Sequence, residues 1–238
     1  MDIYAHRGNS GEAPENTLEA FRQAIAIGAD GVEFDVQLTK DGVPVVIHDE
    51  TVNRTTDGVG AVQDLTLQQI QALDAGKWLA AKYSGERIPT LEAVLALLKD
   101  SGLRINIELK TNRVPYPGIA RATIELVRKH GLERRVQISS FNHQTLREAR
   151  QTAPDLEYAV LTADQMLEPW TYVKHYGFQG FHPGGYAVSE EVVRRCHDSG
   201  LKVRVWTVDD PKHAEEFARI GIDALITNHP RRFIGRFR

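Results

Sequence analysis

The chain alternates short runs of β-branched or apolar residues with longer runs of helical periodicity, and this alternation limits its fold more than any other feature. It is typical of repeated βαβ units, and therefore of a parallel sheet covered by helices. The strand-like runs are nine in number and begin at Ile3, Val32, Pro44, Ile105, Val136, Tyr158, Phe178, Val203 and Ala224. A closed (β/α)8 barrel needs eight parallel strands, so one of these runs has to lie outside the ring.

The third run is the one that does not fit a parallel barrel. Only the four residues Lys40–Val43 separate it from the preceding strand, too few for the crossover that joins parallel neighbours. The Asp-Gly pair in this connection is typical of a tight antiparallel turn. We therefore predict a hairpin with arms Val36–Thr39 and Pro44–Ile47, standing above the C-terminal face of a (β/α)8 TIM barrel that the other eight runs form. This hairpin places His48 roughly opposite Asp35.

The helical runs carry recognisable ends. Asn16 precedes the first of them, and Glu19 stands three residues later, as in a capping box. Thr90 and Ser189 hold the same position before later helical runs. Asp210 is followed by proline, which is favoured at the first position of a helix. These ends predict helices between the strands, as a barrel requires.

The length of the chain limits its domain organisation, and its net charge limits the partners that it can bind. The 238 residues suit one barrel domain spanning 1–238, because such barrels typically occupy about 250 residues. Residues 49–89 contain no barrel strand, and we predict a small insertion within the domain, since roughly 40 residues are too few for a stable core of their own. The formal net charge of −3 argues against a nucleic-acid partner, because proteins that bind a phosphate backbone usually present a basic face.

We predict a cytoplasmic location and no membrane insertion. The first residues run into a polar motif without the basic and apolar regions of a signal peptide. No segment approaches the roughly 18 consecutive apolar residues of a membrane span. The single cysteine, Cys196, cannot form an internal disulfide, which suits a reducing compartment, and its place in an apolar helical pattern favours a core position. The sequence leaves the oligomeric state open.

Two strand-like runs carry acidic side chains on one face. Glu33 and Asp35 are two residues apart and share one side of their strand, whereas Phe34 and its valine neighbours share the other. If Phe34 packs against the helices, both carboxylates point into the barrel, where unpaired acids repel each other. Glu108 and Lys110 repeat the pattern on a later run.

A shared divalent cation would relieve this repulsion. Glu33, Asp35 and Glu108 form an all-oxygen set, which selects Mg²⁺ or Ca²⁺ over zinc. The alternative is a structural network in which Arg7 and Lys110 neutralise the acids. Two polar-inward strands in one barrel favour the metal, and the sequence does not distinguish Mg²⁺ from Ca²⁺.

Two histidines end strand-like runs and are expected beside these acids. His6 ends the first run and is followed by Arg7, and His48 ends the return arm of the hairpin. Histidine serves as acid or base near neutral pH, and arginine binds phosphate oxygens in bidentate fashion. A metal, two histidines and the cations Arg7 and Lys110 favour phosphoryl chemistry. The sequence has no glycine-rich phosphate loop, which argues against nucleotide hydrolysis.

Two aromatic residues fall near the C-terminal ends of strand-like runs. Trp206 lies near the top of the penultimate run, and Phe141 holds a similar place after the run that begins at Val136. Each either walls the site against the carbon atoms of a substrate or belongs to the core, and the sequence leaves both interpretations open.

These residues lie in a series of motifs whose order and spacing are similar to those of one known family. The motifs are His6-Arg7-Gly8, Pro14-Glu15-Asn16-Thr17, Glu33-Phe34-Asp35-Val36, Thr39-Lys40-Asp41-Gly42, Val45-Val46-Ile47-His48-Asp49, Asn53-Arg54-Thr55-Thr56, Ile107-Glu108-Leu109-Lys110, Val205-Trp206-Thr207-Val208 and Asp223-Ala224-Leu225-Ile226-Thr227-Asn228. Nearly end to end, the chain resembles the glycerophosphodiester phosphodiesterases, relatives of phosphatidylinositol-specific phospholipase C.

The resemblance implies a divalent-metal site, an acid–base pair and two phosphate-binding cations. Glu33, Asp35 and Glu108 would hold the metal. His6 and His48 would be the acid–base pair, and Arg7 and Lys110 would bind the phosphate. Small cytoplasmic members of the family act on small-molecule glycerophosphodiesters such as glycerophosphocholine or glycerophosphoethanolamine. The resemblance therefore implies release of sn-glycerol 3-phosphate and an alcohol.

Three other functions remain compatible with these residues. A metal-dependent lyase or aldolase would use Lys110 to activate a carbonyl group, a catalytically inactive barrel would only bind its ligand, and a phospholipase would act on intact membranes. The paired histidines and the hairpin that delivers His48 favour the phosphodiesterase over the first, and the presence of every candidate residue favours it over the second. The nucleophile, either water or the glycerol 2-hydroxyl, and the histidine that starts as base stay open.

Overall fold

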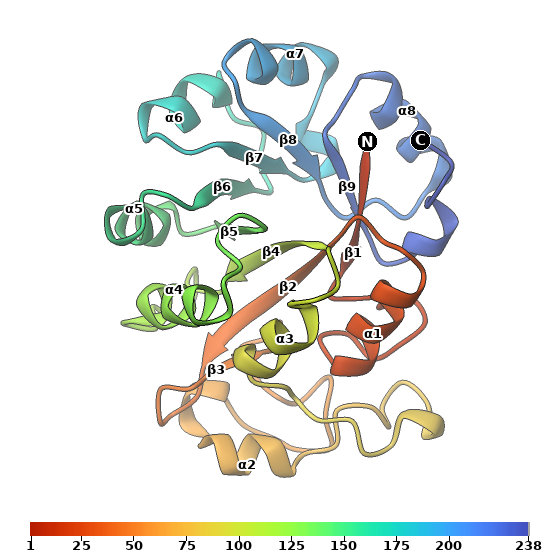
Figure 1. Ribbon diagram of the computed structural model, residues 1–238, viewed down its shortest axis with the longest axis vertical. Helices are drawn as coiled ribbons and strands as arrows, with labels where there is room; N and C mark the ends of the chain where they lie inside the picture. The colour runs from red at the N-terminus through yellow and green to blue at the C-terminus, as the bar shows by residue number, and fades with distance from the viewer. Residues whose placement is uncertain (238) are drawn as a thin grey trace.

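The computed structural model describes residues 1–237, and within them eight parallel strands close into a barrel (Figure 1). In order around the ring they are β1 (Asp2–His6), β2 (Gly31–Leu38), β4 (Arg104–Leu109), β5 (Val136–Ser140), β6 (Glu157–Thr162), β7 (Gly180–Pro183), β8 (Lys202–Val205) and β9 (Ala224–Thr227). The ring closes because β1 pairs in parallel with both β2 and β9. The predicted TIM barrel is confirmed. The largest difference between a predicted and an observed strand start is in β7, which begins at Gly180 and not at Phe178.

The strand β3 (Pro44–Val46) lies outside the ring and forms the antiparallel hairpin expected from the sequence. It pairs with the second half of β2, with Val36 opposite Val46. The backbone N–H of Ile47 donates to the carbonyl oxygen of Asp35 at 3.0 Å, so Asp35 faces Ile47. The hairpin therefore presents His48 one residue beyond the position opposite Asp35.

Helices lie between the strands, and all except the second, which packs on the hairpin, cover the outer side of the barrel (Figure 1). They are α1 (Leu18–Ala26), α2 (Leu67–Ala72), α3 (Leu91–Leu98), α4 (Ile119–His130), α5 (His143–Thr152), α6 (Pro169–His175), α7 (Glu190–Asp198) and α8 (Pro211–Arg219). The side chains of Thr90, Ser189 and Asp210 accept hydrogen bonds from backbone N–H groups in the first turns of α3, α7 and α8. These three predicted caps are confirmed.

The cap of α1 differs from the prediction. Thr17, not Asn16, is the N-cap residue, and its hydroxyl accepts a hydrogen bond from a backbone N–H in the first turn. Asn16 adopts a left-handed backbone conformation with φ of 58°, and its side-chain amide donates to Asp35 Oδ2 at 2.9 Å. The capping-box interpretation of Asn16 and Glu19 is wrong, because the Asn16 side chain is committed to an acidic residue of β2.

The main apolar core lies between the strands and the surrounding helices. Phe34 is fully buried and packs edge-on against Phe21 of α1, with ring centroids 5.4 Å apart. Val32 and Val36, on the same side of β2, are equally buried. Because alternate residues of a strand face opposite sides, this packing turns the two acidic residues of β2 toward the barrel interior.

Residues 49–89, orange to yellow in Figure 1, connect β3 to α3 and contain α2. They also form the 3-10 turns η1 (Val62–Asp64) and η2 (Ala81–Tyr83). Together with the hairpin they build a second apolar cluster, here called the hairpin cluster, made of Val45, Ile47, Val52, Val62, Ile70, Ala75 and Ile88. The hairpin arm that leads to His48 is therefore packed on this segment.

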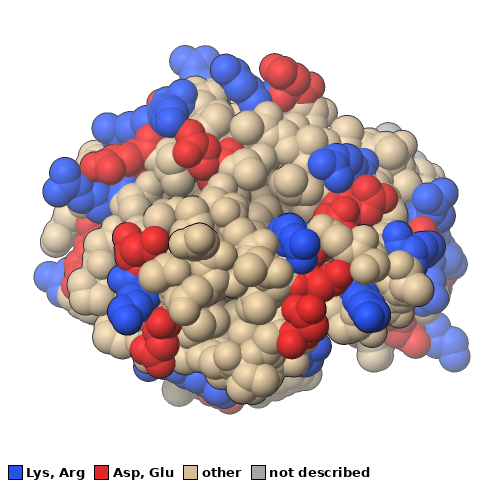
Figure 2. Space-filling view, turned by 90° about the horizontal axis from the view of Figure 1, so that it is seen from below, with Lys and Arg blue, Asp and Glu red and all other residues tan. Residues whose placement is uncertain are grey.

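The surface carries charges of both signs. Figure 2 shows one face of the molecule, on which Lys and Arg are interspersed with Asp and Glu. Among residues 1–237, no helix combines the length and apolar character needed to cross a bilayer. Cys196 is a buried free thiol of α7 within the main core, as expected.

Candidate active site

Three acidic side chains meet where β2 and β4 run side by side. In the parallel register Asp35 stands opposite Glu108, and Glu33 lies two residues earlier on β2. One oxygen from each of the three carboxyl groups lies within 4.8 Å of the other two. Their exposed fractions are 5% for Glu33, 1% for Asp35 and 7% for Glu108. These three residues, here called the acidic cluster, are brought together from positions far apart in the sequence.

Burial and mutual repulsion act unequally within the acidic cluster. Burial, reinforced by the charges of Asp35 and Glu108, raises the pKa of Glu33 well above its usual value. Burial and the charge of Asp35 raise the pKa of Glu108 to about 7. Burial opposes ionisation of Asp35 as well, but positive neighbours, Arg7 first among them, lower the pKa of this carboxyl below its usual range. Asp35 therefore holds the permanent negative charge of the cluster.

Two cations reach the acidic cluster from neighbouring strands. Lys110 Nζ lies 3.0 Å from Glu108 Oε1 and 3.8 Å from Asp35 Oδ1, and Arg7 Nε lies 3.4 Å from Asp35 Oδ2. Arg7 has a left-handed φ of 55°, and Gly8 follows with φ of 79°. A Cβ on Gly8 would lie 2.6 Å from the Cβ of Ala20, so glycine is required for the turn that aims Arg7 at β2.

The acidic cluster fits a hard divalent cation. Its donors are carboxylate oxygens, the ligand type that Mg²⁺ and Ca²⁺ prefer. Burial first, and then mutual repulsion, raises the pKa values of Glu33 and Glu108, and a bound cation would favour the ionised form of both acids. The ion pairs with Arg7 and Lys110 are present too, so the metal site and the ion-pair network, posed as alternatives from the sequence, are compatible with each other.

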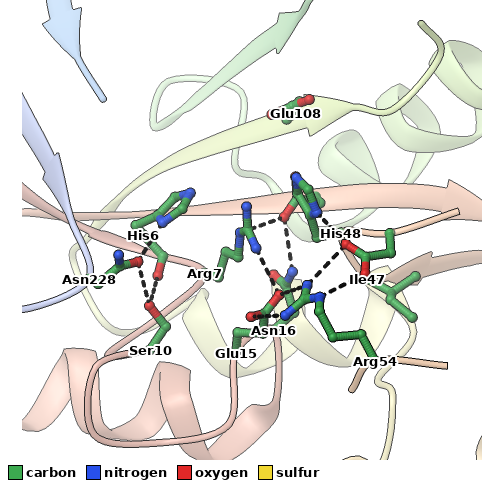
Figure 3. A network of polar contacts seen from close by, with 12 residues as sticks. His6, Arg7, Ser10, Glu15, Asn16, Ile47, His48, Arg54, Glu108 and Asn228 are labelled. Atoms are coloured by element: carbon green, nitrogen blue, oxygen red, sulfur yellow. Dashed lines mark hydrogen bonds and ion pairs between the residues drawn. The ribbon is translucent and has the colours of Figure 1, made fainter. Parts of the chain in front are cut away.

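His6, at the end of β1, has its tautomer fixed by a neighbouring amide (Figure 3). Asn228 Nδ2 donates to Asp209 Oδ2 at 2.7 Å, so Asn228 Oδ1 is the atom that lies 2.6 Å from His6 Nδ1. That oxygen accepts, which means that Nδ1 carries the proton and Nε2, 3.8 Å from Glu33 Oε2, keeps its lone pair. Burial, and then the positive Arg7, lowers the pKa of His6 to about 4, so the ring is neutral at pH 7.

His48 has a carboxylate partner instead of an amide. Its Nδ1 lies 2.7 Å from Asp49 Oδ1. Hydrogen bonds from Arg54 lower the pKa of Asp49 to about 2, so Asp49 accepts and His48 Nδ1 carries the proton. Gln37 holds the backbone here, since its Nε2 lies within 3.1 Å of the carbonyl oxygens of Ile47, His48 and Asp49.

His6 and His48 border one cavity of about 70 Å³, here called the site cavity. Phe141 and Trp206 form part of its wall and pack edge to face, with ring centroids 5.4 Å apart. A wider cleft of about 540 Å³ adjoins it and shares Trp206. Both aromatic residues thus lie at the wall of the site, and their contact with a substrate stays a prediction.

The structure adds polar residues to which the sequence gave no role in the site. Glu15, Asn16, Arg54 and Asn228 all contact a candidate site residue or its direct partner (Figure 3). The sequence pointed to these residues only through the motifs in which they lie, which are similar to those of the glycerophosphodiester phosphodiesterases. Gln37 stands in none of those motifs, and only its position on β2 could have suggested a role beside the hairpin.

Comparisons with known proteins agree on one family. The model described as the Glycerophosphoryl diester phosphodiesterase family matches residues 6–232. A glycerophosphodiester phosphodiesterase of Caldanaerobacter subterraneus subsp. tengcongensis is 44% identical over 236 residues, which cover 99% of this chain and 97% of that protein. A glycerophosphodiester phosphodiesterase of Bacillus altitudinis is 41% identical, covering 98% of this chain and 96% of the relative.

Solved structures show the same likeness. A phosphodiesterase of Oleispira antarctica, in complex with the product sn-glycerol-3-phosphate, has a TM-score of 0.91 and 30% identity over 98% of this chain and 95% of that one. A putative glycerophosphoryl diester phosphodiesterase of Silicibacter pomeroyi has a TM-score of 0.90 and 29% identity over 100% of this chain and 92% of that one.

Proposed function

We propose a metal-dependent, two-histidine mechanism for this chain, which belongs to the glycerophosphoryl diester phosphodiesterase family and hydrolyses glycerophosphodiesters. The products we assign are sn-glycerol 3-phosphate and an alcohol. The first of these is the product bound to the Oleispira antarctica relative. In this proposal the acidic cluster is the metal site, His6 and His48 transfer protons, and Arg7 and Lys110 engage the phosphate.

One observation carries the proposal: two members of the acidic cluster, Glu33 and Glu108, border the same small cavity as both imidazoles. The lining of the site cavity includes His6, Arg7, Glu33, His48 and Glu108. A phosphodiester placed there would meet positive charge for its non-bridging oxygens and two groups that transfer protons. These are the requirements of phosphodiester hydrolysis, in which negative charge on the phosphate has to be neutralised as the nucleophile approaches.

The mechanism follows from the proton positions in the site. A divalent cation at the acidic cluster would supply Lewis-acid neutralisation of the phosphodiester. Arg7 donates to a non-bridging oxygen, with its guanidinium held by Asp35. His6, neutral and unprotonated at Nε2, takes the proton of the nucleophile. His48 keeps its Nδ1 proton on the Asp49 carboxylate and delivers a second proton, carried at Nε2, to the departing alkoxide.

Two nucleophiles are compatible with this arrangement. His6 would deprotonate either a water molecule or the 2-hydroxyl group of the glycerol moiety. The second route forms a cyclic phosphate, which water then opens. The relationship of the family to phospholipase C supports the second route, and the detection of cyclic glycerol phosphate during turnover would identify it.

The finer substrate and cofactor assignments also belong to the proposal. We assign glycerophosphocholine or glycerophosphoethanolamine as the substrate, a small molecule, because the family resemblance implies deacylated phospholipids. The cation is Mg²⁺ or Ca²⁺, both of which take oxygen ligands. A cytoplasmic location is supported by the single thiol, Cys196, which is buried and unpaired as is usual in a reducing compartment.

Release of sn-glycerol 3-phosphate is the direct test of the proposed function. The purified protein is expected to release it from glycerophosphocholine and glycerophosphoethanolamine, to lose this activity in a chelator, and to recover it when Mg²⁺ or Ca²⁺ is restored. An enzyme assay coupled to glycerol 3-phosphate measures all three steps. A carbonyl product would favour the lyase alternative, and ligand binding without turnover in either metal would favour the inactive barrel.

A further inference from the structure

Arg54, from the segment 49–89, binds two carboxylates at once (Figure 3). Its Nε and Nη2 donate to Asp49 Oδ2 and Oδ1 at 2.7 and 3.0 Å. Its Nη1 and Nη2 donate to Glu15 Oε2 and Oε1, both at 2.8 Å. Each carboxylate is bound in bidentate fashion, which a planar guanidinium achieves and a lysine ammonium does not.

Each of the two carboxylates has a second partner in the site. Asp49 Oδ1 accepts from His48 Nδ1 at 2.7 Å, and Glu15 Oε1 accepts from Arg7 Nη1 at 2.8 Å. Arg54 is therefore linked through Asp49 to the proton donor His48. Through Glu15 it is linked to Arg7, which binds the phosphate. Without Arg54, Glu15 keeps an ion pair with Arg7, whereas Asp49 keeps only its hydrogen bond to His48, the residue that it orients.

Asp49 depends on Arg54 more than Glu15 does. Among residues 1–237, the side-chain partners recorded for Asp49 are His48 and Arg54. Without Arg54, Asp49 would be held only by the imidazole of His48, which it is meant to orient. The repulsion between the carboxylates of Asp49 and Glu15 would also increase, because the cation that they share would be lost. The carboxylate would then be free to turn away from His48 into solvent, since its side chain is 28% exposed.

We propose that Arg54 is a positioning residue for proton delivery: it fixes Asp49, Asp49 orients His48, and His48 protonates the departing alkoxide. The inference rests on the proposed function. The Arg54 side chain is 45% exposed at the rim of the site, and its four hydrogen bonds all end on the two carboxylates behind His48 and Arg7.

The test compares two leaving groups. Arg54→Ala is expected to lower kcat about 10–100-fold for glycerophosphocholine, with KM little changed, because a misplaced catalytic group still permits binding. With the p-nitrophenyl ester of sn-glycerol 3-phosphate the loss is expected to shrink to a few-fold, since p-nitrophenolate departs without a proton. Arg54→Lys is expected to recover only part of kcat, because an ammonium does not hold both carboxylates.

A double variant and a matched control complete the experiment. In the His48→Ala background, Arg54→Ala is expected to cause little further loss, because both changes remove the same step. Arg87→Ala is the control: Arg87 lies in the same segment, is exposed, and contacts the carbonyl oxygen of Ala72 at 3.4 Å. It is expected to keep the wild-type kcat and the wild-type unfolding temperature.

Three results would overturn the inference: full activity of Arg54→Ala, equal losses on the two esters, or losses that multiply in the double variant. If Arg54→Ala fails to fold, Arg54→Gln and Asp49→Asn carry the same comparison, since Gln keeps part of the apolar stem of Arg54 and Asn keeps the size of Asp49. A wild-type protein that releases no sn-glycerol 3-phosphate would contradict the proposed function instead.

Discussion

His48→Ala is expected to lower kcat about 10²–10⁴-fold for glycerophosphocholine, because the departing choline alkoxide needs a proton that this imidazole supplies. The loss is expected to be much smaller for the p-nitrophenyl ester of sn-glycerol 3-phosphate. The structural reason is the hydrogen bond from His48 Nδ1 to the Asp49 carboxylate, which fixes the orientation of the imidazole. Initial rates of product release with the two esters measure the difference.

His6→Ala is expected to cost a similar factor, about 10²–10⁴-fold, but on both esters alike. The reason is that His6 acts on the nucleophile and not on the leaving group. His175→Ala serves as the control, because His175 is an exposed residue of α6 to which no role is assigned. Near-full turnover by both His6→Ala and His48→Ala would show that the assignment of the acid–base pair is wrong.

Removal of the divalent cation is expected to abolish turnover, and Glu108→Gln is expected to lower it by at least about 10²-fold in saturating metal, because charge neutralisation at the phosphate is lost. The cation should also stabilise the folded protein. At a concentration of about 100 times its Kd it contributes about 2.7 kcal/mol to the free energy of unfolding, a rise of about 5–10 °C in Tm. Calorimetry with and without Mg²⁺ or Ca²⁺ measures this rise independently of activity.

In the metal-free protein, replacing one acid of the cluster is expected to preserve or raise stability. Glu33→Gln removes one of three buried acids that lie within 4.8 Å of one another, so its metal-free Tm is expected to equal or exceed that of the wild type. The increase on adding metal should be lost. Glu125→Gln, an exposed residue of α4, should keep the wild-type response to metal. Unchanged metal-dependent stabilisation in Glu33→Gln would place the ion elsewhere.

The barrel and the acidic cluster follow from simple periodicity. Strands alternate their faces, so an apolar Phe34 against the helices forces Glu33 and Asp35 inward, and the same rule turns Glu108 inward. The connection of four residues before Pro44 was too short for a parallel crossover, which predicted the hairpin. Each of these inferences needs only near neighbours in the chain or the general rule of a closed barrel.

The partners of the site residues could not be predicted in this way. Arg54 and Asp49 meet Glu15 because the loop after β3 converges with the loop after β1, and loop conformation depends on contacts between residues far apart in the sequence. Asn16 shows the same limit: its position before a helix suggested a cap, yet its left-handed backbone turns the side chain to Asp35. The tautomer of His6 depends on Asn228, 222 residues away.

The two apolar clusters divide the chemistry between them. The main core supports the strands that bear the metal ligands and His6, whereas the hairpin cluster supports the arm that bears His48. Regions with a smaller core open at lower free-energy cost than the rest of a protein. Warming that melts only the smaller cluster would thus leave a molecule that still captures its ion and its substrate but has lost its proton donor, so inactivation would precede global denaturation.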